Sequence, residues 1–456
     1  MIKSYHPGVA QQLRKNKQFR VQIIILLFII TLVPGCQRSG QEEIQLFPTA
    51  GQQISVFGWV GASFSGPMEK SSVETAFSIT PETDGQIFWQ GDTLWFRPIQ
   101  PFDAGVVYRA RFSGEVRTAD GKTFTIDHTW DFTARKPDLI YFVPNEEGGE
   151  LWRFSLNENN AYQMSFTEGR VYDFAVDRMD GQVVFTVMNA DGGRNLRVME
   201  RDGEEQRLFL DCNRDLCGEP AWSTDGQTIA YTREMYLEDN GSYQLGQVWT
   251  VDLESGQTSQ LYQSEFAFGH SPSFSPDGQR LAFYDSNNYG IRILDLATSQ
   301  ESIIPRTIPG AGDWSPDGSK IIYTDLVPAE NEPFVAVYVV DLETKVVERV
   351  LSEGGSDTDY SQPRWAPDGE RVAVSLRPVN ANISKELWVL RLDGLVSRKI
   401  TNDRTATFTT YQWDPWGERL VYQRYELGTG ETSIWLWEDG ENKQIVENGA
   451  RPQWLP

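Results

Sequence analysis

The strongest constraint on the fold is a phrase that recurs through the C-terminal part of the chain. Each copy joins a short strand, usually ending in an aromatic residue, to a Ser-Pro-Asp-Gly-like turn and an apolar strand. The copies are AWSTDGQTIAY at 221–231, SFSPDGQRLAFY at 273–284, DWSPDGSKIIY at 313–323, RWAPDGERVAV at 364–374, QWDPWGERLVY at 412–422 and a degenerate DFAVDRMDGQVVFT at 173–186. Pro and Asp favour a turn and Gly permits positive φ, so each copy predicts a β-hairpin.

A further strand follows each hairpin at a nearly constant distance. Its seven copies begin at residues 151, 196, 248, 291, 337, 387 and 434, which are 45, 52, 43, 46, 50 and 47 residues apart. A period of this length with four short strands per repeat is typical of a β-propeller. We expect an all-β chain with a seven-bladed propeller over residues 137–456, or a six-bladed one if one repeat is irregular.

The sequence also predicts how the ring closes. The first repeat, which begins with LIYFV at residue 139, has no aromatic-turn strand before it, whereas RPQWLP at 451–456 matches that missing strand. We expect the C-terminal strand around Trp454 to complete the first blade, which removes free sheet edges. The tryptophans that recur with the repeat should pack between blades: Trp222, Trp314, Trp365, Trp413 and Trp454. Trp416 replaces the Asp of one turn, so we expect it to be exposed.

Residues 44–136 form a separate segment of short alternating strands, including ISVFGWV, AFSIT, TLWFRP and VYRARFSGEV. Gly, Pro and Asp punctuate them, which predicts a small β-sandwich. The phrases FSGPMEKSSVETAFSITP and TLWFRPIQPF resemble the bacterial Ig-like domain family of S-layer and envelope proteins. This resemblance implies a spacer or adhesion module without catalytic residues.

The WSPDG-type turns resemble the WD40-like (PD40) propeller repeats of TolB and of prolyl-oligopeptidase-type enzymes. The resemblance covers about 320 residues. It implies the propeller fold, but fold alone does not imply function. TolB has a different N-terminal domain, so the resemblance does not carry over its partners.

The N-terminus has the composition of an export signal. Residues 1–35 contain five basic residues and no acid, with an apolar run of eleven residues at 23–33. A membrane-spanning helix needs about 20 apolar residues, so this run suits a signal peptide. Val-Pro-Gly-Cys at 33–36 resembles the lipobox of bacterial lipoproteins. That resemblance implies a lipid anchor on Cys36 and a linker over 36–43; an ordinary signal peptide or an uncleaved anchor is the alternative.

Cys212 and Cys217 are the two remaining cysteines. Export places them in an oxidising compartment, where one lipidated and two paired thiols leave none over. We therefore predict a local disulfide.

Composition and motifs disfavour several function classes. The chain has 41 Lys and Arg against 64 Asp and Glu, a net charge of -23, which disfavours a nucleic-acid partner. It has no G-x-S-x-G elbow, and only His128 and His270 follow residue 35. We expect a non-enzymatic protein without a cofactor or metal; no motif supports a structural Ca²⁺.

Long connections of variable length should share one face of the propeller. They occupy residues 211–219, 233–247, 326–336, 353–360 and 377–386. Variable loops on a rigid scaffold are common binding sites. The candidate binding residues are Glu234, Asp239, Glu330, Glu332, Asp357, Asp359 and Trp416. A solvated acidic surface is the alternative interpretation.

These features support three functional hypotheses. The leading one is a lipid-anchored bacterial envelope protein, facing the periplasm or the exterior, whose propeller binds an envelope protein. The second is a cell-wall glycan-binding module that uses Trp416, Tyr236, Tyr243 or Tyr360. The third is a cation-dependent, lyase-like or lactonase-like enzyme whose loop carboxylates hold the cation.

Overall fold

The computed structural model describes residues 44–261, 268–329, 333–350, 358–379, 381, 383–393 and 397–456. Glu43–Pro456 form one compact unit. Cys36, Glu330, Glu332 and Asp357 lie outside the described residues. Among the described residues, no helix is long and apolar enough to span a membrane.

The first domain is a sandwich of two four-stranded sheets. One sheet has the order β1 (Ile44–Phe47), β3 (Val60–Phe64), β6 (Thr93–Pro98) and β5 (Gly85–Gln90). The other has the order β2 (Gln53–Ile54), β8 (Thr123–Ala134), β7 (Val107–Arg117) and β4 (Phe77–Thr80). Large aromatic side chains fill the space between them; the ring centroids of Phe112 and Trp130, for example, lie 5.9 Å apart.

One helix, α1 (Lys70–Ala76), precedes β4 and differs from the strand-only expectation. It buries Val73 and Ala76 in the sandwich core, whereas Ser72 and Glu74 are half-buried and the other side chains are exposed. A seven-residue helix is too short for its periodicity to show in the sequence. The all-β Ig-like class is unaffected by it.

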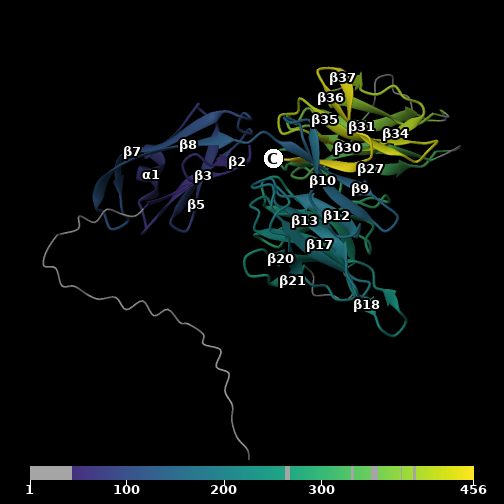
Figure 1. The fold of residues 1–456 in the computed structure, drawn as a ribbon, viewed down its shortest axis with the longest axis horizontal. Helices are drawn as coiled ribbons and strands as arrows, with labels where there is room; N and C mark the ends of the chain where they lie inside the picture. Colours follow the sequence, from purple (N-terminus) through teal and green to yellow (C-terminus); the bar gives the residue numbers. More distant parts are fainter. Residues whose placement is uncertain are drawn as a thin grey trace, which may run out of the picture. The chain divides into compact units, whose positions relative to one another are not determined.

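The second domain consists of antiparallel sheets with the strand order of propeller blades (Figure 1, blue to yellow). The sheet that contains both ends of the domain has the order β38 (Ala450–Leu455), β9 (Asp138–Pro144), β10 (Gly149–Ser155) and β11 (Asn160–Gln163). An eight-stranded sheet follows, because the single parallel bridge between Arg194 and Leu216 joins two four-stranded halves. These halves are β12 (Val171–Val176), β13 (Val183–Met188), β14 (Arg194–Met199) and β15 (Arg207–Leu210), then β16 (Leu216–Trp222), β17 (Thr228–Glu234), β20 (Gln247–Asp252) and β21 (Thr258–Gln260).

The later sheets repeat the same four-stranded order. They comprise β22 (Gly269–Phe274), β23 (Arg280–Asp285), β24 (Gly290–Asp295) and β25 (Glu301–Pro305); β26 (Asp313–Trp314), β27 (Lys320–Val327), β28 (Phe334–Asp341) and β29 (Val347–Val350); β30 (Thr358–Trp365), β31 (Arg371–Pro378), β32 (Glu386–Arg391) and β33 (Ser397–Lys399); and β34 (Ala406–Trp413), β35 (Leu420–Glu426), β36 (Thr432–Glu438) and β37 (Glu441–Val446). The count of seven blades stays a prediction, whereas the all-β class with an Ig-like domain before the propeller is confirmed.

The recurring turn is held by its own side chains. The backbone N–H of Arg280 donates to Ser275 Oγ at 2.9 Å, and Ser275 Oγ in turn donates to the Asp277 carboxylate. Asp277 Oδ1 also accepts the N–H of Gln279 at 3.0 Å, and Gly278 has φ +73°. The same bonds recur at Ser223, Asp225 and Gly226 and at Ser315, Asp317 and Gly318. These residues therefore serve the hairpin, and Gly supplies the positive φ that the turn requires.

The recurring tryptophans link neighbouring blades, as predicted. In four of the five, the indole Nε1 donates to a carbonyl on the innermost strand of the preceding blade. The pairs are Trp222 to Ala175 at 3.1 Å, Trp314 to Ser273 at 3.3 Å, Trp413 to Arg364 at 3.3 Å and Trp454 to Gln412 at 3.2 Å. Trp365 is buried at the same position but makes a different link, from its backbone N–H to Asp313 Oδ2 at 2.7 Å.

The C-terminal strand closes the ring. Trp454 lies opposite Leu139 in the pairing of β38 with β9. The strand also contacts both neighbouring blades, because Trp454 N–H donates to Gln412 Oε1 at 2.8 Å and Gln453 Nε2 donates to the Phe174 carbonyl at 3.3 Å. The last strand therefore joins the first repeat to the blades on either side of it.

Several contacts join the Ig-like domain to the propeller within this compact unit. Ser55 Oγ donates to the Arg178 carbonyl at 2.6 Å, and the Arg178 guanidinium lies 4.2 Å from the centre of the Phe57 ring. Arg135 donates to the Pro456 carbonyl at 3.2 Å. Arg178 belongs to the degenerate repeat copy, so the contacts of Ser55 and Phe57 are made with the turn between β12 and β13.

Trp454→Ala should lower the free energy of unfolding by about 3–5 kcal/mol, because it removes a buried indole and leaves a cavity between blades. Urea unfolding followed by circular dichroism measures this change. Phe166→Ala is the control, since Phe166 is 73% exposed and its loss should change stability by less than about 0.5 kcal/mol. Equal destabilisation by the two variants would contradict closure through Trp454.

Candidate binding surfaces

The propeller has two faces with different connections. We call one the turn face; it carries the Ser-Asp-Gly turns and the links between third and fourth strands. The other, which we call the loop face, carries the links between second and third strands and the crossings to the next blade. The described residues of the long variable segments belong to the loop face, as the strand order requires.

The acidic residues predicted for the loop face are not a free cluster. Asp359 accepts Arg377 Nε at 3.0 Å and pairs with Lys385 Nζ at 3.2 Å. Burial lowers the pKa of Lys385, and the Asp359 carboxylate opposes that shift. Glu234 is half-buried at the end of β17, and Asp239 is exposed in a hairpin turn. The structure therefore does not bring these three acids together into one site.

Arginine pairing extends to other carboxylates near this face. The pairs are Asp215 with Arg233, Asp285 with Arg292 and Asp403 with Arg424. In the last two pairs the arginine follows the carboxylate by 7 and 21 residues. Sequence reasoning missed these pairs because they depend on strand register.

Trp416 does not lie on the loop face and is only half-exposed, which corrects the sequence prediction. It occupies a turn on the turn face and packs against the aromatic core of the Ig-like domain. Tyr360, a glycan-stacking candidate, is 1% exposed and belongs to a core cluster. Neither aromatic side chain is available at the predicted binding face.

A recurring strained residue lines the inner strands. Glu219, Ser271, Gln362 and Arg451 have φ values of +49°, +56°, +50° and +49°, and each precedes a proline. Register shifts in β16, β22, β30 and β38 fall at these positions. The sequence signal is a Pro two residues before the recurring aromatic, as in EPAW, SPSF, QPRW and RPQW. Because the strain recurs with the repeat, it belongs to the ring architecture.

These residues connect adjacent inner strands. Glu219 accepts Ser271 N–H at 2.7 Å and Ser271 Oγ at 3.0 Å, and Arg451 donates to Asp173 Oδ1 at 3.3 Å. Burial raises the pKa of Asp173, and the Arg451 charge opposes that rise. The charged groups of Glu219, Arg451 and Asp173 therefore link neighbouring inner strands of the propeller.

Ser271 and His270 also meet, with Oγ and Nδ1 2.9 Å apart. In a nucleophilic triad the carboxylate orients the imidazole, and the imidazole takes the hydroxyl proton. Here the Glu219 carboxylate accepts the Ser271 hydroxyl directly, and it lies 3.9 Å from His270 Nδ1. The contacts thus run Glu–Ser–His, which is the wrong order for a triad. Among the described residues, no group of three or more His, Cys, Asp or Glu could hold a metal ion.

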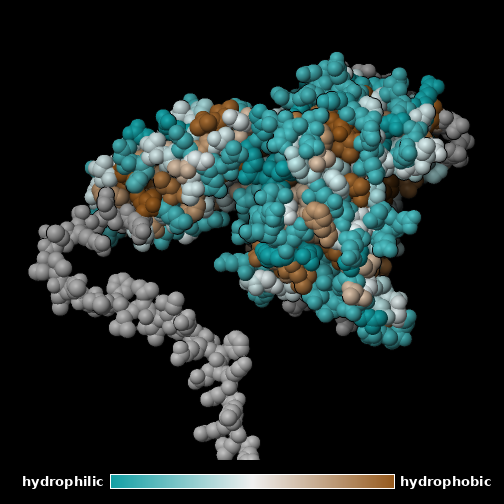
Figure 2. Space-filling model, viewed as in Figure 1, coloured by the Kyte–Doolittle hydropathy of each residue, from teal (hydrophilic) through white to brown (hydrophobic). Residues whose placement is uncertain are grey.

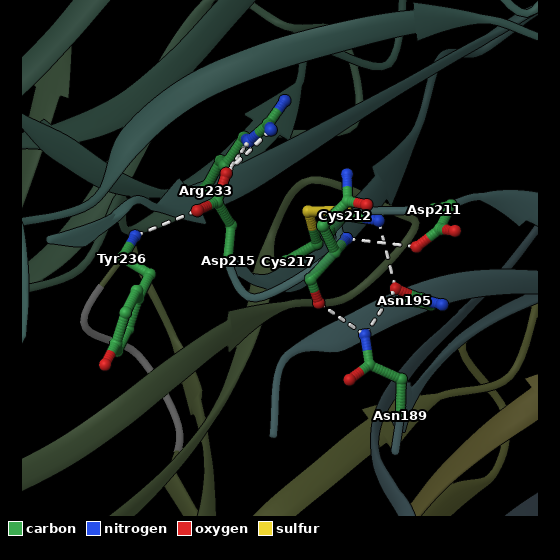
Figure 3. Close-up of a disulfide and its surroundings, with 9 residues drawn as sticks. Asn189, Asn195, Asp211, Cys212, Asp215, Cys217, Arg233 and Tyr236 are labelled. Atoms are coloured by element: carbon green, nitrogen blue, oxygen red, sulfur yellow. Dashed lines mark hydrogen bonds and ion pairs between the residues drawn. A yellow bond between two sulfur atoms is a disulfide. The ribbon is translucent and has the colours of Figure 1, made fainter. Parts of the chain in front are cut away.

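The disulfide loop braces a projecting hairpin (Figure 3). Cys212 and Cys217 are joined, with Cα atoms 6.4 Å apart and both side chains buried. Between them, Asp215 Oδ1 accepts the N–H of Tyr236 at 2.8 Å and Oδ2 accepts Arg233 Nε at 2.8 Å. Tyr236 opens the hairpin of β18 (Tyr236–Leu237) and β19 (Ser242–Tyr243), which extends beyond the sheet that contains β17 and β20 (Figure 1).

A second brace comes from Arg214, which donates to both carboxylate oxygens of Glu238 at 2.9 and 2.8 Å. Its guanidinium lies 3.7 Å from the centre of the Tyr236 ring, and Tyr236 packs edge-on against Tyr243 at 5.4 Å. The hairpin is therefore held from its base in one conformation.

Large apolar side chains are exposed on several blades of the loop face. They are Phe166 (73% exposed), Tyr289 (66%), Leu245 (62%) and Leu427 (55%). All four lie in connections between second and third strands or between blades. In the view of Figure 2, hydrophobic residues form separate patches within a largely hydrophilic surface.

Comparison with known proteins agrees with this architecture. Residues 178–325 match the family described as the TolB beta propeller domain, and residues 44–134 match the bacterial Ig-like domain. The chain carries a TolB-like propeller behind a bacterial Ig-like domain.

The curated relatives are distant. The Tol-Pal system protein TolB of Francisella tularensis subsp. holarctica is 24% identical over 275 residues, which span 57% of this chain and 59% of that protein. The chain therefore aligns with less than two thirds of that relative. Dipeptidyl-peptidase 5 of Porphyromonas gingivalis is 27% identical over 155 residues, 31% of this chain and 22% of that enzyme.

A solved acylaminoacyl peptidase from Pyrococcus horikoshii superposes with a TM-score of 0.50 and 13% identity, covering 84% of this chain and 54% of that one. At this identity the likeness shows the fold alone.

Arg214→Ala should loosen the β18–β19 hairpin without unfolding the propeller. It removes an exposed ion pair and a cation–π contact, both of which are weak at a solvent-exposed site. Amides of residues 236–243 should exchange with deuterium about three- to tenfold faster. The matched control is Arg109→Ala, which breaks the exposed pair with Asp131 on the Ig-like domain. Unchanged exchange in the hairpin would contradict the brace.

Proposed function

We propose that this protein is a non-enzymatic component of the bacterial cell envelope whose loop face binds a protein partner. The observation that carries the proposal is that the four most exposed large apolar side chains in the described part of the propeller, Phe166, Tyr289, Leu245 and Leu427, all lie on one face of the ring. Fully burying such a side chain contributes about 1.5–3 kcal/mol, so exposed groups on a rigid scaffold mark an interaction surface.

The charges near this face support a protein partner over a metal or a small anion. The carboxylates of Asp215, Asp359 and Asp403 are already paired with arginine or lysine. Paired polar groups on the same face as exposed apolar side chains are common in protein interfaces, which combine apolar contacts with hydrogen bonds. The distant relative's name, Tol-Pal system protein TolB, supports an envelope setting of the same general kind.

The proposal includes export and a lipid anchor on Cys36, which rest on the N-terminal sequence. Cys36 and the seven residues after it, eight residues in all, precede the first strand at Ile44. Fully extended, they reach about 27 Å, so the Ig-like domain would stay close to the bilayer. With two or more acyl chains, attachment at Cys36 would be stable.

A photo-crosslinking amino acid at Tyr289 or Phe166 should capture the same partner protein in intact cells, identified by mass spectrometry. Placed at Leu296 or Val346, which are exposed on the turn face, it should not capture that protein. The expectation follows because interface energy concentrates in buried apolar and aromatic anchors. Recovery of the monomer alone, or equal capture from both faces, would contradict a loop-face partner.

Cys36→Ser should release the protein from membranes, because it removes the thiol that carries the lipid. Fractionation of cells by ultracentrifugation, with alkaline carbonate washing, measures the attachment. Cys212→Ser is the control, since it also removes a cysteine but leaves the anchor intact. Tight membrane attachment of the Cys36→Ser protein would refute the anchor while leaving the loop-face proposal standing.

A further inference from the structure

The outer surface of one Ig-like sheet carries aromatic side chains that the domain core does not use. Strand register aligns Phe47, Gly61, Trp95 and Phe88 across β1, β3, β6 and β5. The core-facing residues of the same sheet, such as Ala62 and Leu94, alternate with them and are fully buried.

We call Phe47, Trp59, Trp95 and Phe88 the aromatic row. The ring centroids of Phe47 and Trp95 lie 5.2 Å apart, those of Trp59 and Trp95 lie 6.1 Å apart, and those of Trp59 and Phe88 lie 4.9 Å apart. All four side chains are half-buried. A Cβ at Gly61 would lie 3.0 Å from the Trp95 ring and 2.0 Å from the Leu94 carbonyl, so Gly61 gives the row its close approach to the sheet.

One end of the aromatic row borders a cavity of about 730 Å³. Trp59 and Phe88 form part of its wall on the Ig-like side, and Phe274 and the Ser-Asp-Gly turns line it on the propeller side. Cavities of this size commonly bind small molecules, and they occur preferentially at domain interfaces.

Polar side chains line this cavity together with the aromatic rings. Arg97 donates to Gln86 Oε1 at 2.7 Å, which fixes an amide and a guanidinium beside the rings. Asp225 and Asp277 also line the cavity, and each uses Oδ1 to hold its own turn. Within the described part of the chain, Oδ2 of each carboxylate accepts no hydrogen bond from another residue.

We propose that this cavity binds a neutral oligosaccharide. A sugar presents an apolar C–H face that packs on an aromatic ring, and hydroxyl groups that both donate and accept hydrogen bonds. Trp59 and Phe88 supply the rings, Asp225 and Asp277 accept hydroxyl hydrogens, and Arg97 donates to sugar oxygens. Two carboxylates against one guanidinium, in a chain of net charge -23, exclude acidic glycans and other polyanions from this site.

The full-length protein should be titrated by calorimetry with neutral tetrasaccharides of glucose, mannose, galactose and N-acetylglucosamine in both anomeric linkages. Tetragalacturonate serves as the acidic comparison. At least one neutral probe should bind saturably, and Trp59→Ala should weaken its affinity about tenfold or more. Trp59→Phe should retain most of the affinity, because a ring remains.

Two further variants keep the test decisive. Gln86→Ala should weaken binding about threefold; it alters an exposed side chain and serves if Trp59→Ala does not fold. Tyr289→Ala, an equally aromatic loss on the loop face, should leave sugar binding unchanged. The proposal is overturned if no neutral probe binds or if tetragalacturonate binds as tightly as the neutral probe. It is also overturned if the affinity for the neutral probe is unchanged in both the Trp59→Ala and the Gln86→Ala protein. Partner capture from Tyr289 is independent of each of these outcomes.

Discussion

The propeller depends on the contact between neighbouring inner strands. Four indole N–H groups donate to carbonyls of the preceding blade, and one of these bonds, from Trp454 to Gln412, lies in the closing strand. Each blade alone would leave the apolar faces of its sheet in water, and only stacking against its neighbours buries them. The indole supplies both the apolar area and the hydrogen bond, which explains why tryptophan recurs at this position.

Arginines after the recurring turn reinforce the same contact. Arg280 donates to the Gly318 carbonyl at 3.1 Å and Arg371 donates to the Gly417 carbonyl at 2.7 Å, each in the following blade. Arg371 and Arg419 also lie 5.0 and 4.8 Å from the ring centres of Trp413 and Trp454. One short sequence phrase thus specifies three features: a turn, a tryptophan that packs between blades, and an arginine that contacts the next blade. The turn face carries these architectural links together with the propeller wall of the cavity, and the loops at the opposite face are left to vary.

What the sequence could predict follows from the range of each interaction. The Ser-Asp-Gly turn is satisfied within about six residues, so its hairpins were predictable from local sequence. Closure by β38 was predictable because the repeat was incomplete at both ends. The pairing of Asp359 with Arg377 and Lys385 was not, because it depends on how loop residues converge. Trp416 failed for a related reason: its neighbour in the fold is a domain more than 280 residues earlier in the chain.

The loop face and the cavity beside the Ig-like sheet lie on opposite sides of a ring whose blades are linked to one another. This separation has a consequence for the free energies of binding at the two sites. Coupling between sites requires an element with two arrangements whose balance both sites bias. The inner strands offer little of this kind, because Glu219, Arg451 and the tryptophans fix each blade to the next. Residues farther apart than about 7–10 Å with no shared partner contribute additively to free energy. A partner on the loop face and a sugar beside the Ig-like sheet should therefore bind independently, with the ring acting as a spacer between two recognition events.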